Sequence, residues 1–176
     1  MKKLSVLLGV LFLSMAVFAQ NGAYSKGDKL LNVGIGLNSY YSGGIPVGAS
    51  FEYGVTEDIS VGLNVDYLSH KYKYYGYGNY KFTALYFGAR GSYHFNTLLN
   101  IENEKVDVYA GAALGYRSFK WNDSYSSEGL GHSYGSGVYL GVFAGGKYYF
   151  TENIGAFAEL GAIGSTNVRI GVAFKF

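Results

Sequence analysis

Apolar and polar residues alternate strictly along the last nine residues of the chain, 168–176. A period of two residues is that of a β-strand, whose successive side chains point to opposite faces. One face carries only apolar residues and the other only small or charged ones: Val168, Ile170, Val172, Phe174 and Phe176 against Arg169, Gly171, Ala173 and Lys175. This pattern is typical of a membrane β-barrel strand, which has lipid on its outer side and a polar lumen on its inner side.

Similar alternation recurs in seven earlier runs, each close to the ~9–11 residues that a tilted membrane strand needs. The expected strands cover residues 29–39, 45–53, 59–69, 82–95, 106–117, 138–150, 154–164 and 168–176. Short turns are expected at 54–58 and 151–153, and long polar loops at 69–81 and 118–137. Because an even number of strands can close without leaving an open edge in lipid, the predicted fold class is all-β, an eight-stranded antiparallel up-and-down transmembrane β-barrel.

The first 19 residues have the features of a secretory signal peptide. A basic start at Lys2 and Lys3 precedes an apolar run that ends before Ala19. That run is shorter than the ~20 residues of a membrane-spanning helix. We therefore expect export through the general secretion pathway and a single barrel domain over residues 20–176. Both termini of that domain are expected in the periplasm.

Composition excludes several other classes of protein. The chain has no Cys, so no disulfide framework holds it together. Without Lys2 and Lys3 it carries 12 basic and 12 acidic residues, which gives no basic surface for nucleic acid. Aromatic residues at the expected strand ends predict two interfacial belts. The periplasmic belt would contain Tyr53, Tyr93, Phe95, Tyr148, Phe150, Phe174 and Phe176, and the outer belt Tyr40, Tyr41, Tyr67 and Tyr116.

The eight runs, the segment Leu85-Tyr-Phe-Gly-Ala-Arg-Gly-Ser-Tyr-His-Phe95 and the terminal Phe176 together resemble the small OmpA-like, porin-family outer-membrane barrels of Gram-negative bacteria. The resemblance implies a monomer in the cell outer membrane, surrounded by outer-membrane lipid and lipopolysaccharide. In such families the final aromatic strand is recognised by the barrel-assembly machinery. This implies an assembly signal at Phe174 and Phe176.

Charged residues at inward positions are the main candidates for function. They are Glu52, Asp66, Arg90, His94, Asp107, Arg117, Lys147, Glu159, Arg169 and Lys175. An eight-stranded barrel is just wide enough for its own side chains to fill it, and a buried charge must be paired. Two interpretations remain open. The charges form either a salt-bridge plug that closes the lumen or a narrow path for ions or small solutes, gated by Arg90, Glu159 and Arg169.

Enzymatic and metal chemistry have little support in the sequence. Glu128, His132 and Ser133 lie together in the 118–137 loop, as an enzyme acting on lipid esters would require, but nothing in the sequence holds them in place. His70, His94 and His132 lack the spacing of metal ligands. We therefore predict no catalytic residue, no metal site, no cofactor and no enzymatic activity.

The expected loop at 71–80 alternates cations with aromatic residues, which suits stacking on surface glycans and pairing with lipopolysaccharide phosphates. The candidate binding residues are Lys71, Tyr72, Lys73, Tyr74, Tyr75 and Tyr77. The alternative is a hairpin that only projects beyond the membrane. The expected function is a structural or surface-interaction role, with a narrow pore as the alternative and a lipid-directed enzyme as the second alternative.

Overall fold

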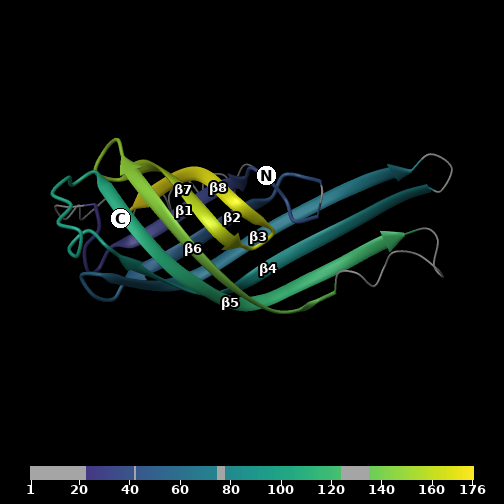
Figure 1. Ribbon diagram of the computed structural model, residues 1–176, viewed down its shortest axis with the longest axis horizontal. Helices are drawn as coiled ribbons and strands as arrows, with labels where there is room; N and C mark the ends of the chain where they lie inside the picture. The colour runs from purple at the N-terminus through teal and green to yellow at the C-terminus, as the bar shows by residue number, and fades with distance from the viewer. Residues whose placement is uncertain (1–22, 42, 75–77, 124–134) are drawn as a thin grey trace, which may run out of the picture.

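A computed structural model of the protein describes residues 23–41, 43–74, 78–123 and 135–176. This part of the chain forms one closed antiparallel barrel in which each strand pairs with the next and the last pairs with the first (Figure 1). The strands are β1 (Lys29–Gly36), β2 (Val47–Gly54), β3 (Ile59–Tyr74), β4 (Gly78–His94), β5 (Val106–Asp123), β6 (Gly137–Tyr149), β7 (Ile154–Ile163) and β8 (Thr166–Lys175). The predicted fold class is confirmed. No helix in the described residues is long and apolar enough to cross a membrane.

The two faces of the barrel wall have opposite chemistry. Leu63 of β3 points outward and is 66% exposed, whereas Glu52 of β2 points inward and is 1% exposed. Soluble proteins normally bury large apolar side chains and expose charged ones. The reverse arrangement suits a wall that faces lipid on the outside and a polar lumen on the inside.

The wall is much taller on one side than on the other. β3, β4 and β5 contain 16, 17 and 18 residues, whereas β1 and β2 contain 8 each. Figure 1 shows these three strands continuing past the rest of the barrel. The sequence-based ranges for them, each close to 9–11 residues, were too short because the alternation continues through polar residues that were assigned to loops.

The segment 71–80 was predicted to be a loop, but most of it is strand. Lys71 pairs with Lys81, and Tyr74 pairs with Gly78, so most of the segment belongs to the β3–β4 hairpin. The side chains of residues 72–80 lie outside the described part of the structure. Of the binding candidates predicted here, only the exposed Lys71 side chain is described.

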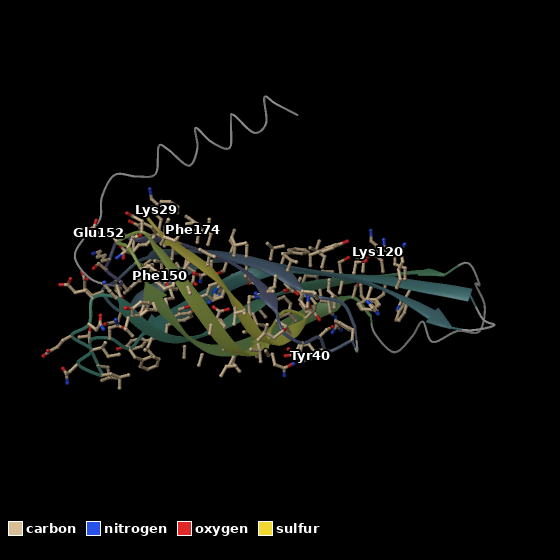
Figure 2. The ribbon with its side chains drawn as sticks, turned by 90° about the horizontal axis from the view of Figure 1, so that it is seen from above. Lys29, Tyr40, Lys120, Phe150, Glu152 and Phe174 are labelled. Atoms are coloured by element: carbon tan, nitrogen blue, oxygen red, sulfur yellow. The ribbon has the colours of Figure 1, made fainter. Side chains whose placement is uncertain are left out.

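The two ends of the barrel differ. We call the end that holds the β2–β3 and β6–β7 turns and Phe176 the short-turn end, and the opposite end the long-hairpin end. Figure 2 shows Lys29, Phe150, Glu152 and Phe174 at the short-turn end and Lys120 towards the other. The predicted belts hold in part. Exposed rings lie at Tyr53, Tyr93, Tyr148 and Phe150 near one end and at Tyr40, Tyr67 and Tyr116 nearer the other.

Tyr41 is the exception, because it is 5% exposed and points into the barrel. It joins a cluster of inward apolar residues formed with Leu68, Phe82, Ala84, Tyr86 and Phe119. The rings of Phe82 and Phe119 are stacked, with their centres 5.4 Å apart. The prediction that Tyr41 belongs to the outer belt is therefore wrong.

We call the part of β3–β5 that lies beyond Tyr67, Leu85 and Tyr116, towards the long-hairpin end, the extension. Its inner face is largely aromatic, because the cluster around Phe82 lies there.

The last residue of the chain takes part in closing the barrel. The Phe176 N–H donates to the Lys29 carbonyl, and the Lys29 N–H donates to the Phe176 carbonyl, each at 3.0 Å. Phe174 pairs in register with Leu31 of β1 and Ile154 of β7. The proposed assembly signal at Phe174 and Phe176 thus lies where the first and last strands meet.

Candidate functional site

Arg90 lies at the centre of the charged lumen, on β4. Its Nη2 donates to Glu159 Oε1 at 2.8 Å, and its Nε lies 2.9 Å from Glu52 Oε1, out of line for a hydrogen bond. The guanidinium carbon is 4.0 Å from the centre of the Phe143 ring. Tyr109 donates its hydroxyl to Glu159 at 3.0 Å. One cation therefore links two buried carboxylates on opposite sides of the lumen.

A chain of hydrogen bonds runs from Glu52 towards the short-turn end. The hydroxyls of Ser60 and Ser92 both donate to Glu52 Oε2, at 2.9 Å and 2.6 Å. Ser60 Oγ also lies 3.0 Å from His94 Nε2, and His94 Nδ1 lies 2.7 Å from Asp107 Oδ1. The Lys147 ammonium donates to Asp107 Oδ2 at 2.9 Å.

His94 connects the two halves of this network through its ring nitrogens. Its Nε2 lies beside the Ser60 hydroxyl, which donates to Glu52, and its Nδ1 lies beside Asp107, which also accepts from Lys147. The buried cations Arg90 and Lys147 thus alternate with the buried carboxylates Glu52, Asp107 and Glu159. Each charge has an oppositely charged or hydrogen-bonded neighbour, which burial in a narrow barrel requires.

A segment preceding β1 covers this network at the short-turn end. The Tyr24 ring stacks on His94 with ring centres 3.5 Å apart and planes 4° apart, and its hydroxyl donates to the Thr56 carbonyl at 2.9 Å. Ala23 is 2% exposed and packs with the inward rings of Tyr149 and Phe157. The segment at residues 23–28, which we call the N-terminal cap, thus fills the mouth of the barrel.

Asp28 holds the N-terminal cap in its turn. The Ser25 N–H donates to Asp28 Oδ2 at 2.8 Å, and the Asp28 N–H donates back to the Ser25 carbonyl. Burial raises the pKa of the Asp28 carboxyl above its ordinary value, and the positive charge of Lys175 offsets the effect only in part. Burial therefore disfavours the ionised form of Asp28 in the folded protein.

Aromatic rings lie against each cation of this region. Besides Arg90 on Phe143, the Lys147 ammonium lies 4.4 Å from the Tyr109 ring, and Lys175 lies 5.2 Å from the Tyr149 ring. The His94 ring stacks on Tyr24. Cation–π contacts of this kind strengthen when water is excluded. Contacts with the inward aromatic rings therefore replace part of the hydration that these cations lose on burial.

A second charged layer lies closer to the long-hairpin end. Asp66 forms an ion pair with Arg169, and the backbone N–H of Ser165 donates to Asp66 Oδ1 at 3.0 Å. The Ser165 hydroxyl also donates to Asp66. Gly164 makes this turn possible, because its φ is +59° and a Cβ there would lie 2.6 Å from the Asp66 Cβ.

The structure gathers most of the predicted lumen charges but not all of them. Glu52, Arg90, His94, Asp107, Lys147 and Glu159 form one network, and Asp66 and Arg169 form the second layer. Lys175 is 4% exposed beside the N-terminal cap. Arg117 is partly exposed near the long-hairpin end, where its Nε donates to the Gly135 carbonyl at 3.0 Å. Its side chain also hydrogen-bonds to Tyr86 and Tyr41, so it contacts the buried aromatic cluster rather than the two charged layers.

Ser60, His94 and Asp107 are connected in the order of a serine hydrolase triad. In a hydrolase the His accepts the proton of the serine hydroxyl. Here the Ser60 hydroxyl donates to Glu52 instead, so His94 does not activate it. Ser60 is fully buried and Tyr24 covers His94. This arrangement serves to satisfy buried polar groups.

The loop residues considered for lipid-ester hydrolysis, Glu128, His132 and Ser133, lie outside the described residues. The predicted signal peptide does too. Among the residues that are described, no group of three or more His, Cys, Asp and Glu side chains is placed to hold a metal ion.

Several residues that matter here were missed from the sequence. Tyr24 precedes the first alternating run, so strand periodicity gave no reason to place it on His94. Ser60 and Ser92 were expected to point inward, but the sequence did not assign them to the charge network. Their spacing on neighbouring strands is visible only once the β3–β4 register, which pairs Ser60 with Ser92, is known.

Eight antiparallel strands closed around buried charges, beneath an apolar outer surface, define an integral β-barrel protein of the outer membrane. The chain belongs to the family of the OprF membrane domain, whose model matches residues 3–169. This confirms the OmpA-like resemblance and the cell outer membrane as its location. A comparison with curated protein sequences finds no match.

Solved structures with a similar fold are also small outer-membrane barrels. The N-terminal β-barrel domain of Pseudomonas aeruginosa OprF aligns with a TM-score of 0.52 at 21% identity, covering 87% of this chain and 100% of that one. Ail, the attachment invasion locus protein of Yersinia pestis, gives 0.54 at 15% identity, over 86% and 99% of the two chains. OprG of P. aeruginosa gives 0.55 at 13% identity, over 87% and 97%. At these identities the similarity concerns the fold alone.

Proposed function

We propose that the protein is a non-enzymatic outer-membrane barrel with a closed lumen and a structural or surface-interaction role. The observation that carries this proposal is the network centred on Arg90, which joins Glu52 to Glu159 across the barrel. The N-terminal cap adds a seal at one end through Tyr24. Cation, carboxylate and ring are all desolvated, so opening a path would require breaking several charge-assisted hydrogen bonds together.

Conductance tests the closed lumen against the narrow pore. The barrel is refolded in detergent, checked by the shift in gel mobility on heating, and inserted into a planar bilayer. A closed lumen predicts a folded protein without reproducible current steps. Reproducible steps whose size changes in Glu159→Ala would overturn the closed lumen and establish the pore.

The proposed orientation places the long-hairpin end outside the cell and both termini in the periplasm. It is supported by the short turns at the end that contains Phe176, as is usual for outer-membrane barrels. Because the chain has no Cys, single cysteines can report each end. Gly135→Cys should react with a membrane-impermeant maleimide on intact cells, and Glu152→Cys should react only after the outer membrane is opened. The reverse result would invert the orientation.

The proposed partners follow from this placement. Outer-membrane lipid and lipopolysaccharide surround the barrel, the barrel-assembly machinery binds its final strand during insertion, and the folded protein is a monomer. Phe174 and Phe176 lie at the seam between β1 and β8, where a bound assembly factor could act before the barrel closes. Phe176→Ala should lower the amount of assembled barrel in cells while leaving refolding in detergent intact. Equal loss in both settings would mean a folding defect instead.

A further inference from the structure

Three lysines lie side by side on the outer face of the extension. Lys71 of β3 pairs directly with Lys81 of β4, and Lys120 of β5 pairs with Thr83, two residues along β4 from Lys81. Directly opposed Cβ atoms are about 5 Å apart, and diagonal ones about 7–8 Å. Lys71 and Lys120 are exposed and Lys81 is half-buried. Figure 2 labels Lys120 on this part of the wall.

Among the described side chains, no carboxylate pairs with this row of lysines. Like charges placed directly opposite each other destabilise a sheet, yet none of the five ion pairs among the described side chains involves these lysines. The described outward neighbours Ser69, Thr83 and Ser118 supply hydroxyls and no negative charge. An anion bound from outside would therefore relieve the repulsion within the row.

The depth of the row indicates where that anion lies. Lys71 is four residues beyond Tyr67 of the aromatic belt, about 13 Å along the strand and about 10 Å in height at the usual tilt. The polar headgroup zone begins at the level of such belts and is about 5–7 Å deep. The backbone of the lysine row therefore lies just above the headgroups, and long lysine side chains can bend down to reach them.

A groove below the row adds a second feature of the same face. It has a volume of about 530 Å³, is almost entirely apolar, and runs over β1–β4. Ala49 and Ala89 form its floor between the larger side chains of Phe51, Leu63 and Phe87. β3 and β4 carry both the groove and two of the lysines. A charged row above an apolar groove matches the two parts of one lipid molecule.

We propose that the outer face of β3–β5 binds one phosphate-bearing lipid of the outer leaflet. Its phosphate pairs with Lys71, Lys81 and Lys120, and one of its acyl chains lies in the groove. This deepens the surface-interaction role and rests on the proposed orientation only for the choice of leaflet.

Native mass spectrometry of the barrel in a neutral detergent tests the site. The probes are a lipid A with its phosphates, the same lipid after enzymatic dephosphorylation, and inorganic phosphate. One phosphorylated lipid should bind, and dephosphorylation should abolish binding. Since each basic residue near an anionic lipid contributes about fivefold, Lys71→Gln/Lys81→Gln/Lys120→Gln should weaken binding roughly 100-fold. Lys26→Gln/Lys29→Gln/Lys105→Gln, three exposed lysines of the short-turn end, is the matched control and should bind normally.

A separate variant tests whether the groove takes part in lipid binding. Ala49→Phe/Ala89→Phe fills the groove and should weaken lipid binding while the lysine row stays intact. Equal weakening by both lysine triples would overturn the site, and so would displacement of the lipid by inorganic phosphate at equal concentration. Binding in detergent does not depend on orientation. If the cysteine labelling inverts while binding holds, the site stands and only its leaflet changes.

Discussion

Strands β3–β5 run through both the barrel and its extension, but the chemistry of their outer and inner faces is reversed between the two regions. In the barrel, β3–β5 turn Leu63, Phe87 and Leu114 outward and the charges of the lumen inward. In the extension they turn Lys71, Lys81 and Lys120 outward and bury a cluster of rings around Phe82. The alternation of side chains continues across the boundary. What changes is the chemistry assigned to each face.

The difference shows that strand periodicity and burial carry separate information. Period two determines which residues share a face, whereas the surrounding medium determines which face is apolar. Lipid surrounds the barrel, so its inner face is the polar one. Polar headgroups and water surround the extension, so its inner face forms an ordinary hydrophobic core. Along β3 the outer face changes from apolar to polar between Tyr67 and Lys71. This change in the sequence marks the membrane boundary on the side of the long-hairpin end.

The largest expected effect comes from breaking the charged centre of the barrel. Arg90→Ala leaves Glu52 and Glu159 buried without their shared cation, and losing one partner of a buried pair costs about 3–5 kcal/mol. The free energy of unfolding, from urea titration in detergent or lipid vesicles, measures this. Lys105→Ala, an exposed cation at the short-turn end, is the control and should cost less than about 1 kcal/mol. Comparable losses in both would mean that the lumen network does not stabilise the barrel.

The boundary itself can be tested with one charge at two heights on β3. Leu63→Lys places an ammonium on the lipid-facing wall near mid-membrane and should cost about 2–4 kcal/mol, whereas Ser69→Lys, beyond the aromatic belt, should cost about 0–1 kcal/mol. Both residues point outward. Ser69→Lys also loses the hydrogen bond from Ser69 to the Phe82 carbonyl and adds a charge beside the lysine row, so these side effects work against the expected difference. Urea unfolding in vesicles measures the pair. Equal costs would place the boundary elsewhere.

The turn between β7 and β8 should show an intermediate effect. Gly164→Ala adds a Cβ at a φ of +59° and pushes it against Asp66. Strain of this kind costs about 1–3 kcal/mol and should displace Asp66 from Arg169. Thermal unfolding measures the loss. Gly135→Ala, with open space around the added Cβ, should leave stability unchanged.

The smallest effect is a pH dependence of the N-terminal cap. Because burial raises the pKa of Asp28 in the folded state, its contribution to stability is full below the ordinary carboxyl pKa and is lost as pH rises through the raised value. Docking of the cap should therefore weaken with rising pH. The NMR shifts of the Tyr24 ring protons, followed from about pH 3 to about pH 7, report docking. Asp28→Asn should remove the dependence, and a dependence that survives in Asp28→Asn would assign it to another group.

The strand count, the closure and the facing of the barrel residues were predictable from the sequence, because lipid on one side forces a strict alternation. The height of β3–β5 was not, since beyond the membrane the same alternation uses Lys and Tyr, which resemble a loop composition. Arg90, Glu159 and Arg169 were grouped as inward charges, but their partners were not predictable: Arg90 pairs with Glu159, whereas Arg169 pairs with Asp66. The Tyr24–His94 stack was not predictable either, because Tyr24 is outside every strand and its position depends on the turn held by Asp28.

The hydrogen bonds between Lys29 and Phe176 have a consequence for the order of events in folding. The first and last strands are partners, so their pairing joins segments separated by nearly all of the described chain. Loop-closure entropy makes such contacts late and slow. Until that contact forms, β1 and β8 are two exposed edges that lipid cannot hydrogen-bond. Insertion hairpin by hairpin therefore gives no stable halfway state, and the ring becomes stable in lipid only once β1 and β8 have paired.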